Sequence, residues 1–250
     1  MRTRAGGSRE SITELTQGSS FIFSGTVLEL GRSNLRVVQA REGLALVRVD
    51  RGLRVDPALG DPAGRVVTVD TGDSGDLRPG DQAVFFTESW IHGDELAVHE
   101  LAHLPIDTVE HVVAEVDRLP ELHLLERLIQ ASVVVRAVVT QTARVPNLPR
   151  ERRAPYWAEA KLRVTSTLKG DARGKRLFFP TSDSHHWYGA PRFRRGRRGV
   201  FLLHDGDPRA IRWLDTSGVD RNVLTALDPA DVQPESELEH IRTLLTRIHH

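Results

Sequence analysis

The sequence repeats itself, and this repeat constrains the fold more than any other feature. Gly60-Asp-Pro-Ala-Gly64 is followed 110 residues later by Gly170-Asp-Ala-Arg-Gly174, and Arg78-Pro-Gly80 is followed 116 residues later by Arg194-Arg-Gly196. Three further pairs occur in the same order: Arg48-Val49 with Arg163-Val164, Gly93-Asp94 with Gly206-Asp207, and Glu121-Leu122 with Glu237-Leu238. Because ordered matches at nearly constant spacing are typical of a duplicated unit, we expect two domains, residues 1–130 and 131–250.

Each half contains short β-branched and aromatic runs of the length that a strand needs. Phe21–Val27 and Val133–Val139 are the first of these, and Leu44–Val49 and Ala160–Thr165 are the second. The Gly-Asp-x-x-Gly and Arg-x-Gly segments between such runs supply residues that adopt positive φ in tight turns. The sequence therefore predicts a mainly β protein with flanking α-helices, in which two small antiparallel OB-like β-barrels follow one another.

Helices are expected after the strands of each half. One run of valines recurs at helical spacing: Val109, Val112, Val113 and Val116. It predicts a helix over residues 108–118, which Pro120 should end because proline lacks the amide hydrogen that a helix interior needs. A second apolar stripe over 122–129 predicts another helix, and its counterpart in the repeat is the stripe over 238–248. We interpret these stripes as faces that pack in the core.

The order of these segments resembles the netrin-like domains, the family that includes the tissue inhibitors of metalloproteinases. The similarity lies in the strand Phe21-Ile-Phe-Ser-Gly-Thr-Val27 and, in the second half, in Val164, Leu168-Lys169-Gly170 and the run from Gly196 to Leu202. It covers both halves loosely and implies a five-stranded OB-type barrel. Netrin-like domains normally carry disulfides, and the inhibitors use an amino-terminal cysteine to reach the metal of their target. Because this chain has no cysteine, the resemblance implies a fold and does not carry over inhibition.

Composition excludes several classes of protein. Without cysteine the chain forms no disulfide, thiolate metal site or thiol nucleophile, and a reducing cytoplasmic location is expected. No apolar run approaches the roughly 18 residues that suggest a transmembrane helix, so no membrane partner is expected. The first residues are basic and lead into charged residues instead of an apolar segment, so we expect no secretory signal. No cofactor motif is complete, and no cofactor is predicted.

Charge is distributed unevenly, although the chain as a whole is neutral. Residues 1–130 carry a net charge of −8, and residues 131–250 carry a net charge of +8. In one loop of the second half, arginines are interleaved with aromatic residues. The predicted binding residues are Arg152, Arg153, Trp187, Tyr188, Arg192, Phe193, Arg194, Arg195, Arg197 and Arg198, a set that Arg150, Tyr156 and Trp157 would extend.

Several interpretations of this Arg/aromatic loop stay open. Guanidinium groups neutralise phosphates and aromatic rings stack on bases, so the pattern is typical of single-stranded nucleic acid binding. The arginines would equally attract an acidic protein partner, or the acidic first half of the same chain. Alternatively, the loop is solvated and Trp187 and Phe193 close the end of the barrel. We take a protein partner as the leading hypothesis.

His99-Glu100-Leu101-Ala102-His103 matches the H-E-x-x-H pattern of zinc peptidases, in which two imidazoles hold the metal and the glutamate acts as general base. That chemistry needs a helix, because residues four apart lie about 13 Å apart on a strand. The repeat pairs this segment with residues 212–216, and both follow a Gly-Asp turn, so we expect a strand. A helix would instead favour a metallopeptidase that uses His99, Glu100 and His103.

Asp70, Asp73 and Asp76, with glycines between them, are an alternative set of oxygen ligands for calcium, although the complete EF-hand pattern is missing. No catalytic constellation is complete, so the sequence leaves enzymatic activity open and favours its absence. The leading hypothesis is a non-enzymatic binding protein that contacts a protein partner through the Arg/aromatic loop of its second barrel.

Overall fold

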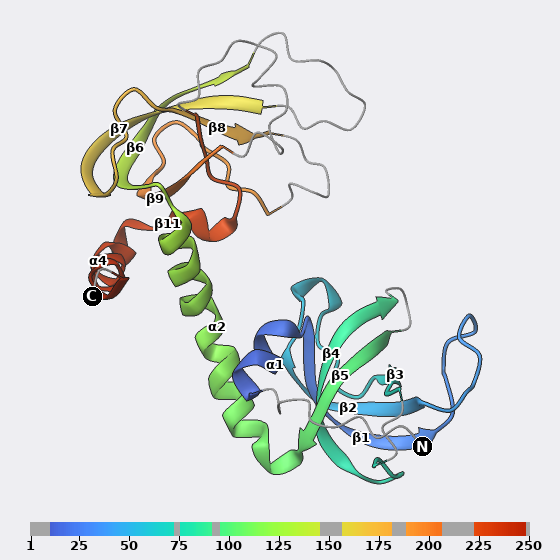
Figure 1. Cartoon of the computed structure of the whole chain (residues 1–250). Coiled ribbons are helices and arrows are strands. Elements are labelled where there is room, and N and C mark those ends of the chain that lie inside the picture. The colour runs from blue at the N-terminus through green and yellow to red at the C-terminus, as the bar shows by residue number, and fades with distance from the viewer. Residues whose placement is uncertain are drawn as a thin grey trace, which may run out of the picture. The chain divides into compact units, whose positions relative to one another are not determined.

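The computed structural model describes residues 11–72, 76–91, 96–145, 157–181, 189–206 and 223–248, without the side chains of 89–91. The chain divides into two units, Met1–Leu119 and Pro120–His250. Each unit contains one closed β-barrel with helices on its outer surface (Figure 1). Within the described ranges, no helix combines the length and the apolar character that crossing a membrane demands.

The barrel of the first unit closes in the order β1-β2-β3-β5-β4. Its strands are β1 (Phe21–Leu30), β2 (Leu44–Arg54), β3 (Val66–Asp70), β4 (Gln82–Ile91) and β5 (Ala97–Pro105). Neighbouring strands are antiparallel except β3 and β5, which are parallel. Helix α1 (Ile12–Gly18) precedes the barrel, and the 3₁₀ helices η1 (Pro57–Leu59) and η2 (Ile106–Thr108) follow β2 and β5.

The second unit has the same strand order. Its strands are β6 (Val133–Arg144), β7 (Trp157–Lys169), β8 (Arg176–Pro180), β9 (Arg198–Asp205), β10 (Val223–Thr225) and β11 (Val232–Gln233). Strand β10 pairs in parallel with β8 and antiparallel with β9, which closes the barrel, and β11 adds to β9. After β10 come η4 (Pro229–Asp231), η5 (Glu235–Glu237) and helix α4 (Leu238–Ile248). The predicted fold class, two tandem OB-like barrels with flanking helices, is confirmed, with one parallel strand pair in each barrel.

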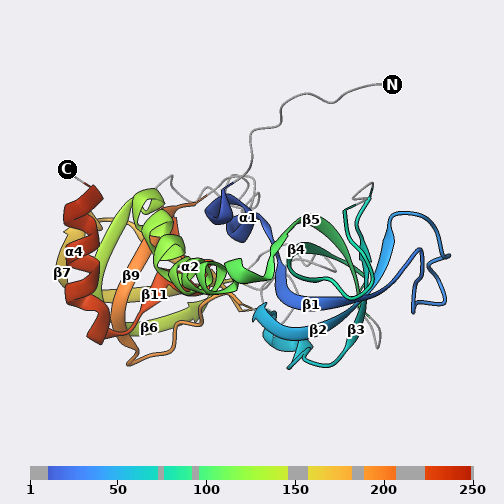
Figure 2. The same cartoon turned by 90° about the horizontal axis from the view of Figure 1, so that it is seen from below.

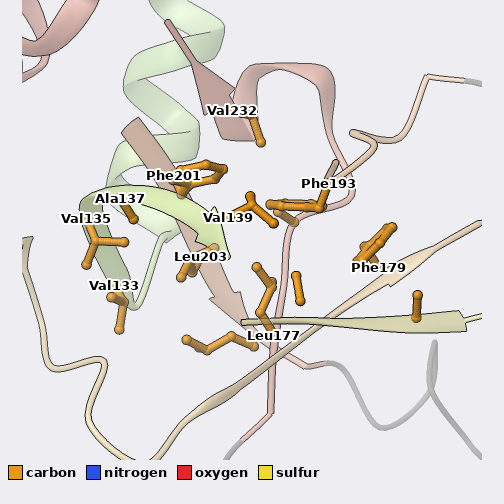
Figure 3. Close-up of a cluster of buried hydrophobic side chains, with 14 residues drawn as sticks. Val133, Val135, Ala137, Val139, Leu177, Phe179, Phe193, Phe201, Leu203 and Val232 are labelled. Atoms are coloured by element: carbon orange, nitrogen blue, oxygen red, sulfur yellow. The ribbon is translucent and has the colours of Figure 1, made fainter. Parts of the chain in front are cut away.

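Alternate residues of the strands fill the barrel interiors, as the period of two in a strand predicts. In β6 the inward residues are Val133, Val135, Ala137 and Val139, all of them buried in one cluster (Figure 3). In the first barrel three stacked rings fill the interior, with centroids 4.8 Å apart for Phe21 and Phe23 and 5.2 Å apart for Phe23 and Phe85. Each such side chain contributes about 1.5–3 kcal/mol by its removal from water.

Irregularities in strand pairing recur at matched places in the two barrels. Between β1 and β2 the register shifts after Ile22, Ser24 and Val27. Between β6 and β7 it shifts after Val134, Arg136 and Val139, each 112 residues later. β-Bulges bend and twist a sheet, and a small barrel needs such bends in order to close.

The outer surface of each barrel carries a second apolar cluster, which two helices cover. In the first unit this cluster lies under α1 and the first half of α2 (Val109–Gln130), and its strand residues are Ile22, Val84 and Phe86. In the second unit it lies under the second half of α2 and α4 (Figure 2), and its strand residues are Val134, Val200 and Leu202. In both units the first and fourth strands therefore carry apolar residues on both of their faces, one toward the barrel interior and one toward the helices.

Helix α2 continues through Pro120, so the prediction that Pro120 ends a helix is wrong. Proline in a helix interior costs about 3 kcal/mol, partly through one lost backbone hydrogen bond. Side chains on either side of it are anchored by packing, Val112 in the cluster of the first unit and Leu124 and Leu128 in that of the second. The division between the two units falls between Leu119 and Pro120, inside this helix, whereas the sequence placed it after residue 130.

The helices of the two units correspond differently from the prediction. Helix α4 follows Pro234 and η5 as α2 follows Pro105 and η2, and Ile241 and Val112 are buried at matched positions. Residues 121–129 instead precede β6, as α1 precedes β1. The predicted match of 121–129 with α4 is therefore wrong, because one continuous helix supplies the last helix of one unit and the first helix of the next.

The fifth strand is interrupted in the second unit. In the first barrel, β5 pairs with β3 at Val98 and Val69 and with β4 at His103 and Phe85. In the second barrel, the corresponding pairs are Leu224 of β10 with Leu177 of β8, and Val232 of β11 with Phe201 of β9. Strands β10 and β11 together thus take the place of β5, with three additional residues between them. The segment 212–216, which the repeat was expected to match with 99–103, lies outside the described residues.

The predicted glycine turns are confirmed, and two of these glycines provide a matched test. Gly170 and Gly174 have φ of 68° and 70°, but a Cβ atom on Gly170 would overlap the carbonyl oxygen of Ser132, whereas one on Gly174 would meet no atom within 4 Å. We expect Gly174→Ala to destabilise the second unit by about 1–2 kcal/mol and Gly170→Ala to cost about 1–3 kcal/mol more. Denaturant unfolding of both variants measures the difference, and equal losses would contradict the close approach.

Candidate functional site at the end of the second barrel

Phe193 closes one end of the second barrel from within. Only 3% of its surface is exposed, and its ring centroid lies 4.9 Å from that of Phe179 and 5.6 Å from that of Phe201 (Figure 3). Leu77, which precedes Gly80 by three residues as Phe193 precedes Gly196, is buried in the core of the first barrel. The alternative that Phe193 fills the barrel end is therefore correct: its ring packs inside the barrel and does not project from the loop with the arginines, as the predicted stacking role would require.

A tight turn after Phe193 carries the arginines outward. The amide of Gly196 donates to the carbonyl of Val139 at 2.8 Å, and the amide of Val139 donates to the carbonyl of Arg197 at 2.9 Å. The first barrel has the same two hydrogen bonds, at the same lengths, between Gly80, Val27 and Asp81. The backbone frame is thus shared, and the side chains on it differ in charge.

The arginines of this turn fall into two groups. Arg192 is half-buried, its Nη1 donates to the carbonyl of Pro180, and its own carbonyl accepts from Nη1 of Arg197 at 2.7 Å. Partial burial lowers the pKa of Arg197. Three exposed arginines form no hydrogen bond or ion pair with any described residue through their side chains: Arg194, Arg195 and Arg198. We call these three the free arginines.

Several other predicted binding residues are not part of this described surface. Arg152, Arg153, Trp187 and Tyr188 lie outside the described residues, together with Arg150 and Tyr156. Trp157 begins β7 and is 2% exposed, so the proposed extension of the surface through Trp157 is wrong. Trp157 is buried on the face of β7 opposite to Ala158 and Ala160, which belong to the interior cluster.

An open cavity of about 650 Å³ lies beside the turn. Its apolar floor consists of Ala158, Phe179 and Phe193, each no more than 5% exposed. The remaining lining residues are polar, cationic or small: Thr142, Ala143, Arg144, Thr181, Arg192 and Arg194. The geometry combines an apolar depression with positively charged edges, an arrangement suited to a ligand that is both apolar and anionic.

The H-E-x-x-H segment lies on strand β5, as predicted from its context, so the metallopeptidase alternative is wrong. Nδ1 of His99 lies 3.4 Å from Asp70 and Nδ1 of His103 lies 2.7 Å from Glu100, so the two imidazoles have separate partners. No group of three or more His, Cys, Asp and Glu side chains in the described part of the chain is arranged to hold a metal ion.

The calcium alternative involves Asp70, Asp73 and Asp76. Asp70 pairs with Arg41 at 2.6 Å, and Asp73 lies outside the described residues.

Glu100 and His103 form a largely buried acid–base pair in the first barrel. The Glu100 side chain is 6% exposed, its Oε2 has no hydrogen-bond partner among the described residues, and the His103 ring lies 6.2 Å from that of Phe85. The hydrogen bond with Glu100 raises the pKa of His103, burial opposes the rise, and the charges of Glu100, Asp76 and Asp81 add to it. The matched position in the second barrel holds Val232, so closing such a barrel does not require the pair.

A buried carboxylate that sequence reasoning missed organises the second unit. Asp231 is fully buried and accepts hydrogen bonds from Nε and Nη2 of Arg127 at 2.8 and 2.9 Å, from Nε2 of His204 at 2.9 Å, and from the amides of Leu227 and Asp228 at 2.9 Å each. Burial raises the pKa of Asp231, but the hydrogen bonds from His204 and Arg127 outweigh it and hold the pKa below its ordinary value. The local signal was the capping pattern from Asp228 to Asp231, which does not indicate the distant partners.

No model of a protein family matches the sequence, and no curated protein matches it. The resemblance to netrin-like domains stays a prediction.

We expect the first unit to lose stability as the pH rises through the folded pKa of His103. Because this pKa is raised on folding, the contribution is fully present below about pH 6.5, the ordinary histidine value, and is lost as the proton leaves at higher pH. Denaturant unfolding at several pH values measures the trend. The double substitution Glu100→Ala/His103→Val should remove this dependence of stability on pH. His99→Val, at an exposed neighbouring position, is the control and should preserve the dependence. A trend that survives the double substitution would show that the pair is not its source.

Asp231→Ala should destabilise the second unit by about 3–5 kcal/mol, because it leaves Arg127 partly buried without its partner. Thermal or denaturant unfolding of the second unit gives the value. Asp171→Ala is the control, because Asp171 pairs with Arg173 at the surface and should change stability little. Similar losses in both variants would contradict the role assigned to Asp231.

Proposed function

We propose that this protein is a binding protein whose second barrel takes an acidic segment of a partner protein at its basic end. One observation carries the proposal: the three free arginines project from the turn that closes the barrel, while the aromatic ring beside them, Phe193, is used in the core. Unpaired guanidinium groups at a surface attract carboxylates, which they bind through two parallel hydrogen bonds.

Single-stranded nucleic acid is the second candidate, since OB-like barrels commonly bind it and the charge has the required sign. Binding without sequence preference also needs exposed rings on which bases stack. The aromatic residues that the structure describes at this end, Trp157, Phe179 and Phe193, are each no more than 4% exposed. Among the described residues no ring projects from this end as a platform for successive bases, and the predicted stacking residues Trp187 and Tyr188 lie outside the described residues; the exposed arginines are what support a protein partner.

We further infer that the two units arose by duplication and then diverged in charge. The equal spacing of the strand irregularities and the matched turns at Gly80 and Gly196 support a common origin. Divided between Leu119 and Pro120, the chain carries a net charge of −7 in the first unit and +7 in the second. The same backbone turn has Arg78 and Asp81 in the first unit where the second has Arg194 and Arg197. An anionic partner is accordingly expected at the second unit alone.

Charge reversal in the turn tests the proposal. The double substitution Arg194→Glu/Arg195→Glu should weaken binding of a labelled Asp/Glu-rich peptide about tenfold or more, measured by fluorescence anisotropy. Arg78→Glu is the matched control in the first barrel and should leave the affinity within about twofold. Circular dichroism of each variant checks that the fold is retained.

A labelled oligothymidylate, titrated at about 50 and 200 mM salt, separates the two candidates. Tighter binding of the oligonucleotide than of the peptide, with a steep loss at the higher salt, would replace the protein-binding proposal by the nucleic acid alternative. Failure of both probes to bind the wild-type protein would reject the basic end as a binding site.

A further inference from the structure

We infer that the cavity beside the turn selects among acidic partners by receiving one large apolar side chain, with carboxylates on either side of it held by the arginines. This inference rests on the proposed function and adds the feature that the partner segment must carry. It commits the site to a protein segment in which a Phe, Leu or similar residue is flanked by Asp or Glu.

The apolar half of the inference rests on the floor of the cavity. Ala158, Phe179 and Phe193 come from β7, β8 and the turn before β9, so three separate segments converge on the depression. Phe179 and Phe193 are fixed in place by their mutual contact, with centroids 4.9 Å apart. The open cavity above this apolar floor, about 650 Å³ in all, is large enough for one aromatic or aliphatic side chain. Anchor residues in such pockets contribute most of the affinity of many interfaces.

The anionic half rests on the position of Arg194, which both lines the cavity and belongs to the free arginines. Arg195 follows it directly, so cationic groups continue from the cavity edge along the turn. A carboxylate next to the apolar anchor can therefore reach a guanidinium group without any movement of the barrel. The apolar floor adds selectivity that charge alone does not supply, because any acidic segment satisfies the arginines.

Two labelled peptides test this inference: one with Phe at the centre of an Asp/Glu-rich segment and one with Ala at the same place. The Phe peptide should bind the wild-type protein about tenfold or more tightly than the Ala peptide, the ratio expected for burial of an aromatic side chain. Ala143→Trp, which fills the cavity from an exposed position and removes no charge, should reduce this ratio to about one. Thr142→Trp serves the same purpose if that variant does not fold.

The outcomes distinguish this inference from the proposed function. Equal binding of the two peptides to the wild-type protein, still weakened by Arg194→Glu/Arg195→Glu, would overturn the apolar site and leave the acidic partner standing. Binding of neither peptide would overturn both. Gln141→Trp is the control, since Gln141 is exposed on the same strand and does not line the cavity, so the ratio should persist in that variant. If Gln141→Trp abolished the difference between the Phe and Ala peptides as Ala143→Trp does, that result would also count against the cavity.

Discussion

Each unit depends on the double pairing of its fifth strand, which closes the barrel. Strand β5 hydrogen-bonds to β3 on one side and to β4 on the other, and β10 does the same with β8 and β9. A closed sheet has no free edge, and its interior must be filled by side chains. This requirement explains the bulges that bend the first strands and the alternating interior residues. It also explains why Leu77 and Phe193 are buried in the barrels.

The two barrels meet this requirement with different chemistry. The first keeps one long fifth strand and holds the Glu100–His103 pair, whereas the second interrupts the strand and anchors the insertion with Asp231. Arg127 of α2 and His204 of β9 both bind that carboxylate, so the helix, the barrel and the insertion are joined at one buried charge. Such a charge is tolerated because all its donors are present. The shared frame is thus compatible with an acidic unit and a basic unit, and the arginines that carry the proposed function sit on a turn that both units possess.

Much of the fold could be predicted from sequence, and much of the site could not. The glycines of the turns were identifiable because positive φ is a local property, and the strands because their apolar residues alternate. Phe193 was misassigned because the sequence pattern of an aromatic residue among arginines is identical whether its ring points outward or inward. The continuous helix through Pro120 was missed because packing on both sides of the proline outweighs a local penalty.

The strands and the turns followed from the amino-acid sequence because each depends on residues close together in the chain, and the opposite charges of the two halves followed from composition alone. The folded chain was needed to show that Phe193 closes a barrel, that His103 pairs with Glu100 on a strand, and that Asp231 accepts hydrogen bonds from Arg127 and His204. Burial and hydrogen-bond partnership depend on segments as distant in sequence as Arg127 and Asp231, which are 104 residues apart and meet only when the barrel closes.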